Sequence, residues 1–283
     1  MRNNNKGKVI LSCKDHTVSG EVFELLHDEN YDMLITSPQP ELDTLSKYYQ
    51  SEDYISHTDA KRSLFEKIYH LVKSFALHKK LKLVNSETNS HENILDIGAG
   101  TGDFLKVAKD KSWNVSGTEP DLKARSLSKE KGILLLEETS LFENHFFDAI
   151  TMWHVLEHVP DVKKQLKELK RLLKPDGTIF IAVPNFKSLD AKKYKEFWAA
   201  YDVPRHLWHF SKTSISKLAE DEGLKVDKIL PMKFDAYYVS LLSEKYKNGK
   251  MNVFKAFFNG FHSNLNALST KEYSSLIYVL KNS

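Results

Sequence analysis

The sequence predicts a doubly wound α/β domain with a mostly parallel sheet of seven strands and a small N-terminal β and helical extension. Short apolar runs alternate with helical stretches, a pattern typical of a parallel sheet covered by helices. One of these runs leads directly into a glycine-rich turn. We expect strands at residues 94–97, 113–117, 133–136, 149–153, 178–183, 224–230 and 274–280. The last should pair antiparallel near the sheet edge.

Length and composition fit one large domain with additions, because 283 residues are ample for a single core. The 41 basic and 38 acidic residues are spread along the chain, which does not favour nucleic acid as a partner. The single cysteine, Cys13, excludes an internal disulfide and fits a reducing compartment. Neither a signal-peptide pattern nor a membrane-span pattern is present. We therefore expect a cytoplasmic protein.

Two regions are expected, a small β appendage at residues 1–57 and the main domain at 58–283. The appendage contains β-like stretches at 22–26 and 32–36, followed by a proline-rich turn at 37–40. The main domain should open with a helix at 58–83. Its apolar positions recur at spacings of three and four and should pack as one stripe, formed by Leu64, Ile68, Leu71, Val72 and Phe75.

The next elements follow from the same patterns. The alternating strands run from the glycine-rich turn to residue 183. Within them, an apolar helical face precedes a turn at 174–177 and is formed by Leu166, Leu169, Leu172 and Leu173. Two insertions interrupt the later part of the domain, an aromatic segment at about 186–212 and a helical, aromatic-rich segment at about 234–268.

The glycine-rich turn is the central chemical signal. Glycines 98, 100 and 102 follow a strand and precede a helix, where the backbone must turn sharply and approach a ligand closely. Asp96 places a carboxylate at the end of that strand. It would repel a pyrophosphate, whereas the positively charged sulfonium and amino groups of S-adenosylmethionine suit it. Glu119, at the end of the next strand, can accept hydrogen bonds from both hydroxyls of a ribose.

On these motifs, the chain resembles the class I methyltransferase superfamily over about residues 60–283, and within it the ubiquinone-biosynthesis O-methyltransferases. The resemblance implies S-adenosylmethionine as cofactor and methyl transfer to a small-molecule acceptor. It implies cofactor contacts from Asp96, Gly98, Gly100, Gly102, Glu119, Pro120, Trp153 and His154. Relatives often carry an acidic residue near the adenine where this chain has Leu136, so the adenine contact stays open.

Two possible metal sites follow from the same resemblance, and we expect neither to hold a metal. Some quinone-ring relatives bind a divalent ion at the segment matching His154, Glu157 and His158, where the first position is commonly Glu. We expect Glu157 and His158 to cap and pack a helix start instead. Many relatives also carry a cysteine-rich zinc ribbon near the N-terminus. Only Cys13 remains here, so the appendage should be metal-free.

The acceptor side is predicted in the first insertion, which should lie over the carboxyl ends of the strands. Its histidines, His206 and His209, are candidates for a general base, because an unperturbed imidazole titrates near neutrality. The alternative is a structural aromatic lid whose histidines bond the backbone. Acceptor contacts are expected from Tyr194, Trp198, Tyr201 and Arg205.

Methyl transfer to a hydroxyl is the function that the sequence favours. A catalytically silent protein that keeps the cofactor fold is one alternative. A nicotinamide-dependent oxidoreductase is another, but it requires a GxGxxG spacing, whereas this chain has GxGxG preceded by Asp96. The sequence leaves the acceptor and the methylated atom open, because a fold does not determine its substrate.

Overall fold

The computed structural model describes residues 7–49 and 64–283. Its main sheet has the order β5-β4-β6-β7-β10-β9. The first four strands in this order are parallel, and β10 runs antiparallel to both β7 and β9. The strands are β4 (Asn93–Ile97), β5 (Asn114–Thr118), β6 (Phe147–Trp153), β7 (Leu173–Pro184), β9 (Leu224–Pro231) and β10 (Ser275–Asn282). The predicted α/β class and the antiparallel last strand are confirmed.

The expected strand at 133–136 is reduced to one parallel bridge between Thr118 and Leu136, so the described sheet has six strands rather than seven. Two backbone hydrogen bonds hold it: Leu136 N–H donates to the Gly117 carbonyl at 3.0 Å, and Glu119 N–H donates to the Leu136 carbonyl at 2.9 Å. Leu134 is 76% exposed. Because Leu134 faces solvent and no further described strand lies beside it, the segment at 133–136 is too little buried to pair over more residues.

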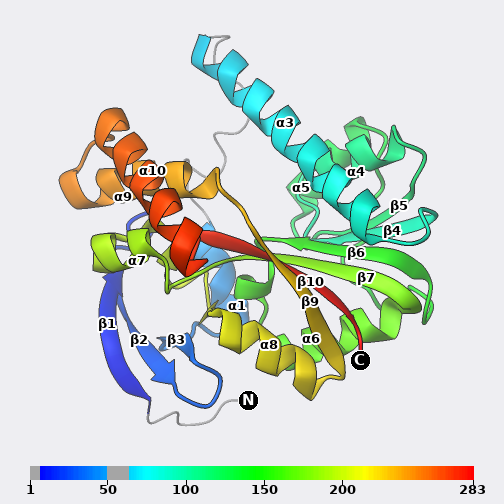
Figure 1. The fold of residues 1–283 in the computed structure, drawn as a ribbon, viewed down its shortest axis with the longest axis horizontal. Coiled ribbons are helices and arrows are strands. Elements are labelled where there is room, and N and C mark those ends of the chain that lie inside the picture. The colour runs from blue at the N-terminus through cyan, green and yellow to red at the C-terminus, as the bar shows by residue number, and fades with distance from the viewer. Residues whose placement is uncertain (1–6, 50–63) are drawn as a thin grey trace.

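Helices cover both faces of the main sheet (Figure 1). One face carries α3 (Leu64–Glu87), α4 (Asp103–Lys109) and α5 (Leu122–Glu130), and the other carries α6 (Val162–Leu172) and α8 (Lys212–Asp221). Neighbouring residues of β4 belong to different cores, Ile94 to one and Leu95 to the other, because strand side chains alternate between faces. Leu166, Leu169 and Leu172 of the predicted apolar face are buried in α6. Leu173 and the expected turn at 174–177 belong to β7 instead.

The expected stripe on the first helix is wrong at Phe75, which is 58% exposed and makes an edge contact with Phe234. The helix packs through its C-terminal half instead, where Leu81 and Val84 join the core formed with α4. Figure 1 shows its N-terminal half extending away from the sheet. Residues 58–63, and the side chains of Leu64, Ile68, Leu71 and Val72, lie outside the described part of the chain.

A second, antiparallel sheet has the order β1-β2-β3-β8. It is formed by β1 (Lys8–Lys14), β2 (Val22–Asp28), β3 (Met33–Ser37) and β8 (Trp208–His209). Strand β8 comes from the first insertion and places His209 opposite Leu34. Strand β1 was not expected, and the short α1 (Leu42–Leu45) and η1 (Ser46–Tyr49) follow β3. Strands between residues 8 and 37 therefore share a sheet with residues 208–209, far along the sequence.

The two insertions pack beside this sheet. The first contains α7 (Leu189–Tyr194), η3 (Lys195–Phe197) and η4 (Ala199–Tyr201), and the second contains α9 (Asp235–Asn248) and α10 (Val253–Thr270). Phe23, Leu25 and Leu34 of the small sheet form one core with Trp198 and Tyr201. Among the residues that the structure describes, no helix is both long and apolar enough to cross a membrane.

Candidate functional site

The glycine loop connects β4 to α4 and requires glycine at two points in particular. Gly98 has a φ of +68°, and a Cβ there would lie 2.5 Å from Cγ2 of Val155. Gly100 has a φ of +54°, but a Cβ there would meet no atom of the described residues within 4 Å. Gly98 is therefore required by close packing against the segment after β6. Gly100 faces open space, which leaves room for a ligand against the backbone.

Asp96 lies at the end of β4, 3% exposed, where the pairing of β4 with β6 places it opposite Thr151. The Thr151 hydroxyl donates to Asp96 Oδ1 at 2.6 Å. Burial raises the pKa of the Asp96 carboxyl to about 7, and the hydrogen bond from Thr151 opposes that rise. A cation beside this carboxylate would favour its charged form.

Glu119 reaches back from the end of β5 to the glycine loop. Its Oε2 accepts the Gly100 N–H at 2.9 Å, and its Oε1 accepts the Asp121 N–H at 3.0 Å. Pro120, next in the chain, is exposed, and its carbonyl accepts from Arg125. Parallel strands end at the same sheet edge, so the two sequence motifs meet as expected. Each carboxylate oxygen keeps a further lone pair for a hydroxyl donor.

Lys80 of α3 is a site residue that the sequence analysis missed. Its ammonium lies 4.5 Å from the centre of the Trp153 ring. Burial lowers the pKa of Lys80, and the charges of Asp235 and Asp96 oppose that change. The buried Trp153 Nε1 has no hydrogen-bond partner in the described residues. The charge of Lys80 thus acts on Asp96, and Trp153 beside Lys80 brings a second donor to the end of β6.

His154 follows Trp153 at the end of β6 with a φ of +59°. Its Nε2 lies 3.0 Å from Oδ2 of Asp235 in α9, and its Nδ1 lies 3.4 Å from Oε1 of Glu157. Burial lowers the pKa of His154, but the two carboxylates outweigh it and raise the pKa to about 9. The imidazole is therefore positively charged at neutral pH and connects the sheet edge to the second insertion.

Glu157, His158 and His206 form a compact cluster in which one ligand atom of each lies within 4.8 Å of the others. Glu157 is 1% exposed, and within the described chain neither of its carboxylate oxygens accepts a hydrogen bond. Burial would raise the pKa of Glu157, but neighbouring histidines hold it below its usual value. Burial lowers the pKa of His158 to about 4, so that ring is neutral. The cluster holds a buried carboxylate beside two imidazoles.

The orientation of His206 follows from its contacts. Its Nδ1 lies 2.9 Å from the carbonyl oxygen of Ala200, which only accepts, so Nδ1 carries the hydrogen. The lone pair of Nε2 then faces the cluster, 4.0 Å from Glu157 Oε1. These groups can hold a proton or a cation. The prediction of no metal stays a prediction, and an ion here would use His206 rather than His154, whose Nε2 pairs with Asp235.

His209 has a different environment. The Thr36 hydroxyl donates to the His206 carbonyl at 2.6 Å, so the 3.0 Å contact between Thr36 Oγ1 and His209 Nε2 requires that nitrogen to donate. Burial holds the pKa of His209 well below its usual value. His209 therefore fixes the pairing of β3 with β8 through a donated hydrogen bond.

The four expected acceptor contacts are all buried, and the side-chain polar atoms of Tyr194, Trp198 and Arg205 bond within the protein. Trp198 Nε1 donates to Asp190 at 2.7 Å, and the Tyr194 hydroxyl donates to Glu244 at 3.0 Å. Tyr201 lies edge-on to Trp198, with ring centres 4.9 Å apart. The bond to Glu244 connects the first insertion to α9, and Asn259 of α10 donates to the Tyr194 hydroxyl. A role in acceptor binding stays a prediction.

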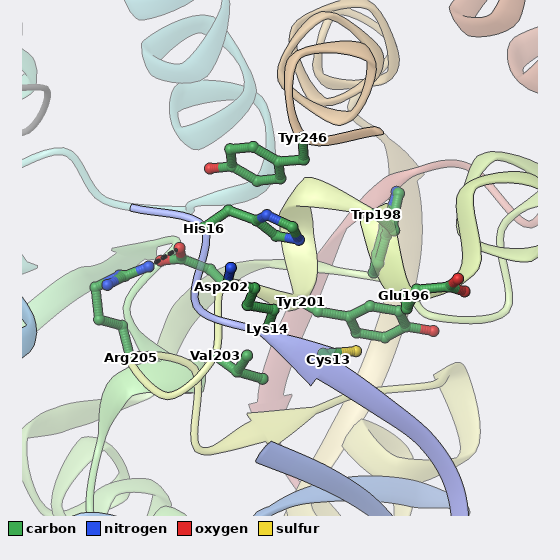
Figure 2. A pocket seen from close by; sticks show the side chains of 10 residues that line it. All are labelled: Cys13, Lys14, His16, Glu196, Trp198, Tyr201, Asp202, Val203, Arg205 and Tyr246. Atoms are coloured by element: carbon green, nitrogen blue, oxygen red, sulfur yellow. Dashed lines mark hydrogen bonds and ion pairs between the residues drawn. The ribbon is translucent and has the colours of Figure 1, made fainter. Parts of the chain in front are cut away.

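Arg205 joins the first insertion to the N-terminal sheet. Its Nη2 lies 2.6 Å from Asp202 and 3.2 Å from Asp15, and its Nη1 donates to the Tyr48 carbonyl at 2.8 Å. Figure 2 shows it at one side of a pocket between β1 and this insertion, with Tyr246 of α9 above His16. None of the residues lining this pocket comes from the glycine loop. The pocket is therefore separate from the cofactor candidates.

Comparisons with known proteins identify the family of the chain. A family model described as "Methyltransferase domain" matches residues 62–229. A ubiquinone/menaquinone biosynthesis C-methyltransferase of Rickettsia bellii is 32% identical over 147 residues, 45% of this chain and 58% of that protein. A ubiquinone biosynthesis O-methyltransferase of Actinobacillus pleuropneumoniae is 32% identical over 108 residues, 33% of this chain and 46% of that protein. The chain thus spans only about half the length of these two relatives.

Solved structures show the same fold at low sequence identity. Magnesium protoporphyrin IX methyltransferase from Synechocystis, with bound SAH, aligns with a TM-score of 0.55 and 12% identity over 85% of this chain and all of that one. A possible histamine N-methyltransferase from Thermotoga maritima aligns with a TM-score of 0.51 and 17% identity over 76% of this chain and 96% of that one. At these identities the likeness concerns the fold.

Proposed function

Because the chain belongs to the methyltransferase-domain family, we propose that it transfers a methyl group from S-adenosylmethionine to a hydroxyl of a small-molecule acceptor. The observation that carries the proposal is the hydrogen bond from Gly100 N–H to Glu119. It brings the ribose-binding candidate against an open glycine backbone. Asp96 lies at the end of the adjoining strand.

The side chains at this sheet edge fit the cofactor. Asp96 offers a carboxylate to a cationic ligand, whereas Lys80 and the unpaired Trp153 Nε1 offer donors to an anionic one. The methionine part of the cofactor carries both an ammonium and a carboxylate. We assign its ammonium to Asp96 and its carboxylate to Lys80 and Trp153. Glu119 holds the ribose hydroxyls.

The choice of a hydroxyl acceptor rests on His206. The bound cofactor supplies an electrophilic methyl group on a sulfonium. With the cofactor bound, the methyl group would pass from its sulfonium to the acceptor oxygen and leave a thioether, and His206 Nε2 would take the proton that the acceptor loses. The Glu157 carboxylate, 4.0 Å from that nitrogen, stabilises the resulting imidazolium. The remaining work of the protein is to align the acceptor and exclude water.

Calorimetry with S-adenosylmethionine and with NAD tests the cofactor. We expect the first to bind and the second not to, because Asp96 repels a pyrophosphate. Incubation with methyl-labelled cofactor and a cell extract, followed by mass analysis, then identifies the product. A product that carries the labelled methyl group on a carbon atom would contradict the hydroxyl proposal and favour C-methylation, the activity named for the Rickettsia relative. Cofactor binding without a labelled product from any extract would indicate a catalytically silent protein.

Replacing Glu119 with Ala should weaken cofactor binding by at least about tenfold. Hydrogen bonds to a charged group contribute roughly 1.5–3 kcal/mol each, and the variant also loses its bond to the Gly100 N–H. Titration calorimetry measures the dissociation constant. Glu143→Ala is the matched control, since that residue is an exposed acid. An unchanged constant in a folded Glu119 variant would remove the ribose assignment.

Cofactor affinity should rise with pH up to about 7. The pKa of Asp96 is raised to about 7 by burial, so below that pH the carboxyl is largely neutral and must lose its proton to pair with a cation. Affinity should therefore fall by up to about tenfold for each pH unit below 7. Calorimetry between pH 5.5 and 7.5 measures the slope. In Asp96→Asn the slope should disappear, and an equal slope there would assign the titration to another group.

A further inference from the structure

Helix α10 carries large apolar side chains on its solvent side. Phe254 is 82% exposed, Phe258 65% and Val253 64%. Phe254, Phe258, Phe261 and Leu265 recur at spacings of four, three and four, so they form one stripe along the helix. We call this stripe, with Val253 and Phe257, the α10 surface.

Apart from Asn259, the buried side of α10 consists of small residues. Ala256, Gly260, Ser263 and Ala267 are all buried. A Cβ on Gly260 would lie 2.9 Å from the Ala236 carbonyl oxygen of α9, so the two helices approach closely. An aromatic residue has no room on that side. The small residues of α10 pack against α9, so the large apolar side chains face solvent. This is the reverse of the usual amphipathic helix of a soluble protein, whose apolar side is buried.

The charge around the α10 surface is positive. Residues 236–271 contain five lysines and a single acid, Glu244. Glu244 is 1% exposed and lies 3.4 Å from Lys255, beneath the helix pair. Lys247 and Lys250 are exposed where α9 passes to α10. Basic groups thus border an apolar stripe, with the one acid inside the protein.

We propose that the α10 surface docks onto an anionic phospholipid membrane, with the helix lying in the plane of the headgroups. Aromatic residues enter the acyl boundary, and bordering lysines bind anionic headgroups. A second copy of the chain fits less well, because a symmetric contact would bring the same basic borders together. Figure 1 shows α9 and α10 at one end of the molecule, away from β4 and β5.

Only the N-terminus of α9 reaches the proposed cofactor site, where Asp235, its first residue, pairs with His154. Membrane docking would therefore hold the end of the molecule that contains α9 and α10 against the lipid. The inference does not rest on methyl transfer. Its test reads lipid binding directly and is unaffected if the proposed reaction is wrong.

Sedimentation with lipid vesicles tests the apolar stripe. We expect the full chain to bind vesicles containing phosphatidylglycerol and to bind pure phosphatidylcholine more weakly. Phe254→Ser with Phe258→Ser should lower partitioning by at least about tenfold, since two largely exposed aromatics are lost. The matched control, Leu141→Ser with Val22→Ser, removes two residues that are 78% and 63% exposed elsewhere and should bind like the unmodified protein.

The lysines provide an independent variant. Lys247→Gln and Lys250→Gln should each lower binding to anionic vesicles about fivefold and leave binding to neutral vesicles unchanged. Circular dichroism confirms that each variant is folded. Failure of the folded protein to sediment with anionic vesicles would overturn the proposal. So would a concentration-dependent dimer that dissociates in the phenylalanine variant, which would assign the surface to a second copy.

Discussion

Replacing His206 with Gln should lower turnover by about 10²–10⁴ and leave cofactor affinity nearly unchanged. The amide cannot take a proton from the acceptor, whereas the cofactor candidates lie on other elements. In the unmodified protein, Nδ1 is held by the Ala200 carbonyl and Nε2 is left to accept the proton. Single-turnover kinetics with labelled cofactor measures the chemical step.

The pH profile distinguishes a base from a structural residue. A neutral imidazole base makes turnover rise with pH, and that limb should vanish in His206→Gln. His209→Gln is the matched control: its nitrogen donates to Thr36, so we expect lower stability and a retained pH limb. If His206→Gln keeps the full profile, alignment alone accounts for catalysis. If a chelator abolishes activity and a divalent ion restores it, the cluster holds a metal.

Replacing Arg205 with Ala should destabilise the protein by about 3–5 kcal/mol, because two carboxylates lose their buried cation. The guanidinium is 3% exposed and joins Asp15 of the N-terminal sheet to Asp202 of the insertion. Thermal unfolding should shift downward by on the order of 10 °C. In Lys228→Ala, which breaks an exposed ion pair with Glu87, the melting temperature should hardly change.

The same variant tests the expected acceptor contact. If Arg205 binds the acceptor, its replacement should raise the acceptor KM while the melting temperature stays close to that of the unmodified protein. Because Arg205 contacts Asp15, Asp202 and the Tyr48 carbonyl, we expect a lower melting temperature and an unchanged acceptor KM. Arg205→Lys is informative too, because lysine keeps the charge but cannot reproduce the planar fork that reaches both carboxylates.

The sheet and the glycine loop could be predicted because their signals are local. Asp96 near the end of β4 and the glycines that follow it are adjacent in sequence, so the strand and the loop can be predicted together. Parallel pairing of β4 with β5 then brings Glu119 to the same edge of the sheet. The failure at 133–136 has the same origin. Its apolar run resembles a strand, but Leu134 faces solvent and pairing stops at one bridge. An apolar pattern alone does not predict how many strands pair with a segment at the sheet edge.

Lys80 and the pairing of β3 with β8 could not be predicted, because both depend on the tertiary arrangement. Lys80 is one of several lysines on α3, and only the helix position shows that this one lies over Trp153. Strand β8 has two residues, too few to carry an alternating pattern. His206 was found from residue type, but its partner Glu157 was expected to cap a helix start. The buried carboxylate became visible only with the fold.

The fourth strand of the small sheet has a consequence for the order in which the chain is made. Strand β3 leaves the ribosome long before β8, and Asp15 appears long before Arg205. Until residue 208 is translated, β3 presents an open edge with buried-type side chains and no native neighbour on that side. Nascent chains that stall or terminate earlier should therefore aggregate or recruit chaperones. Chains that have passed the insertion should not.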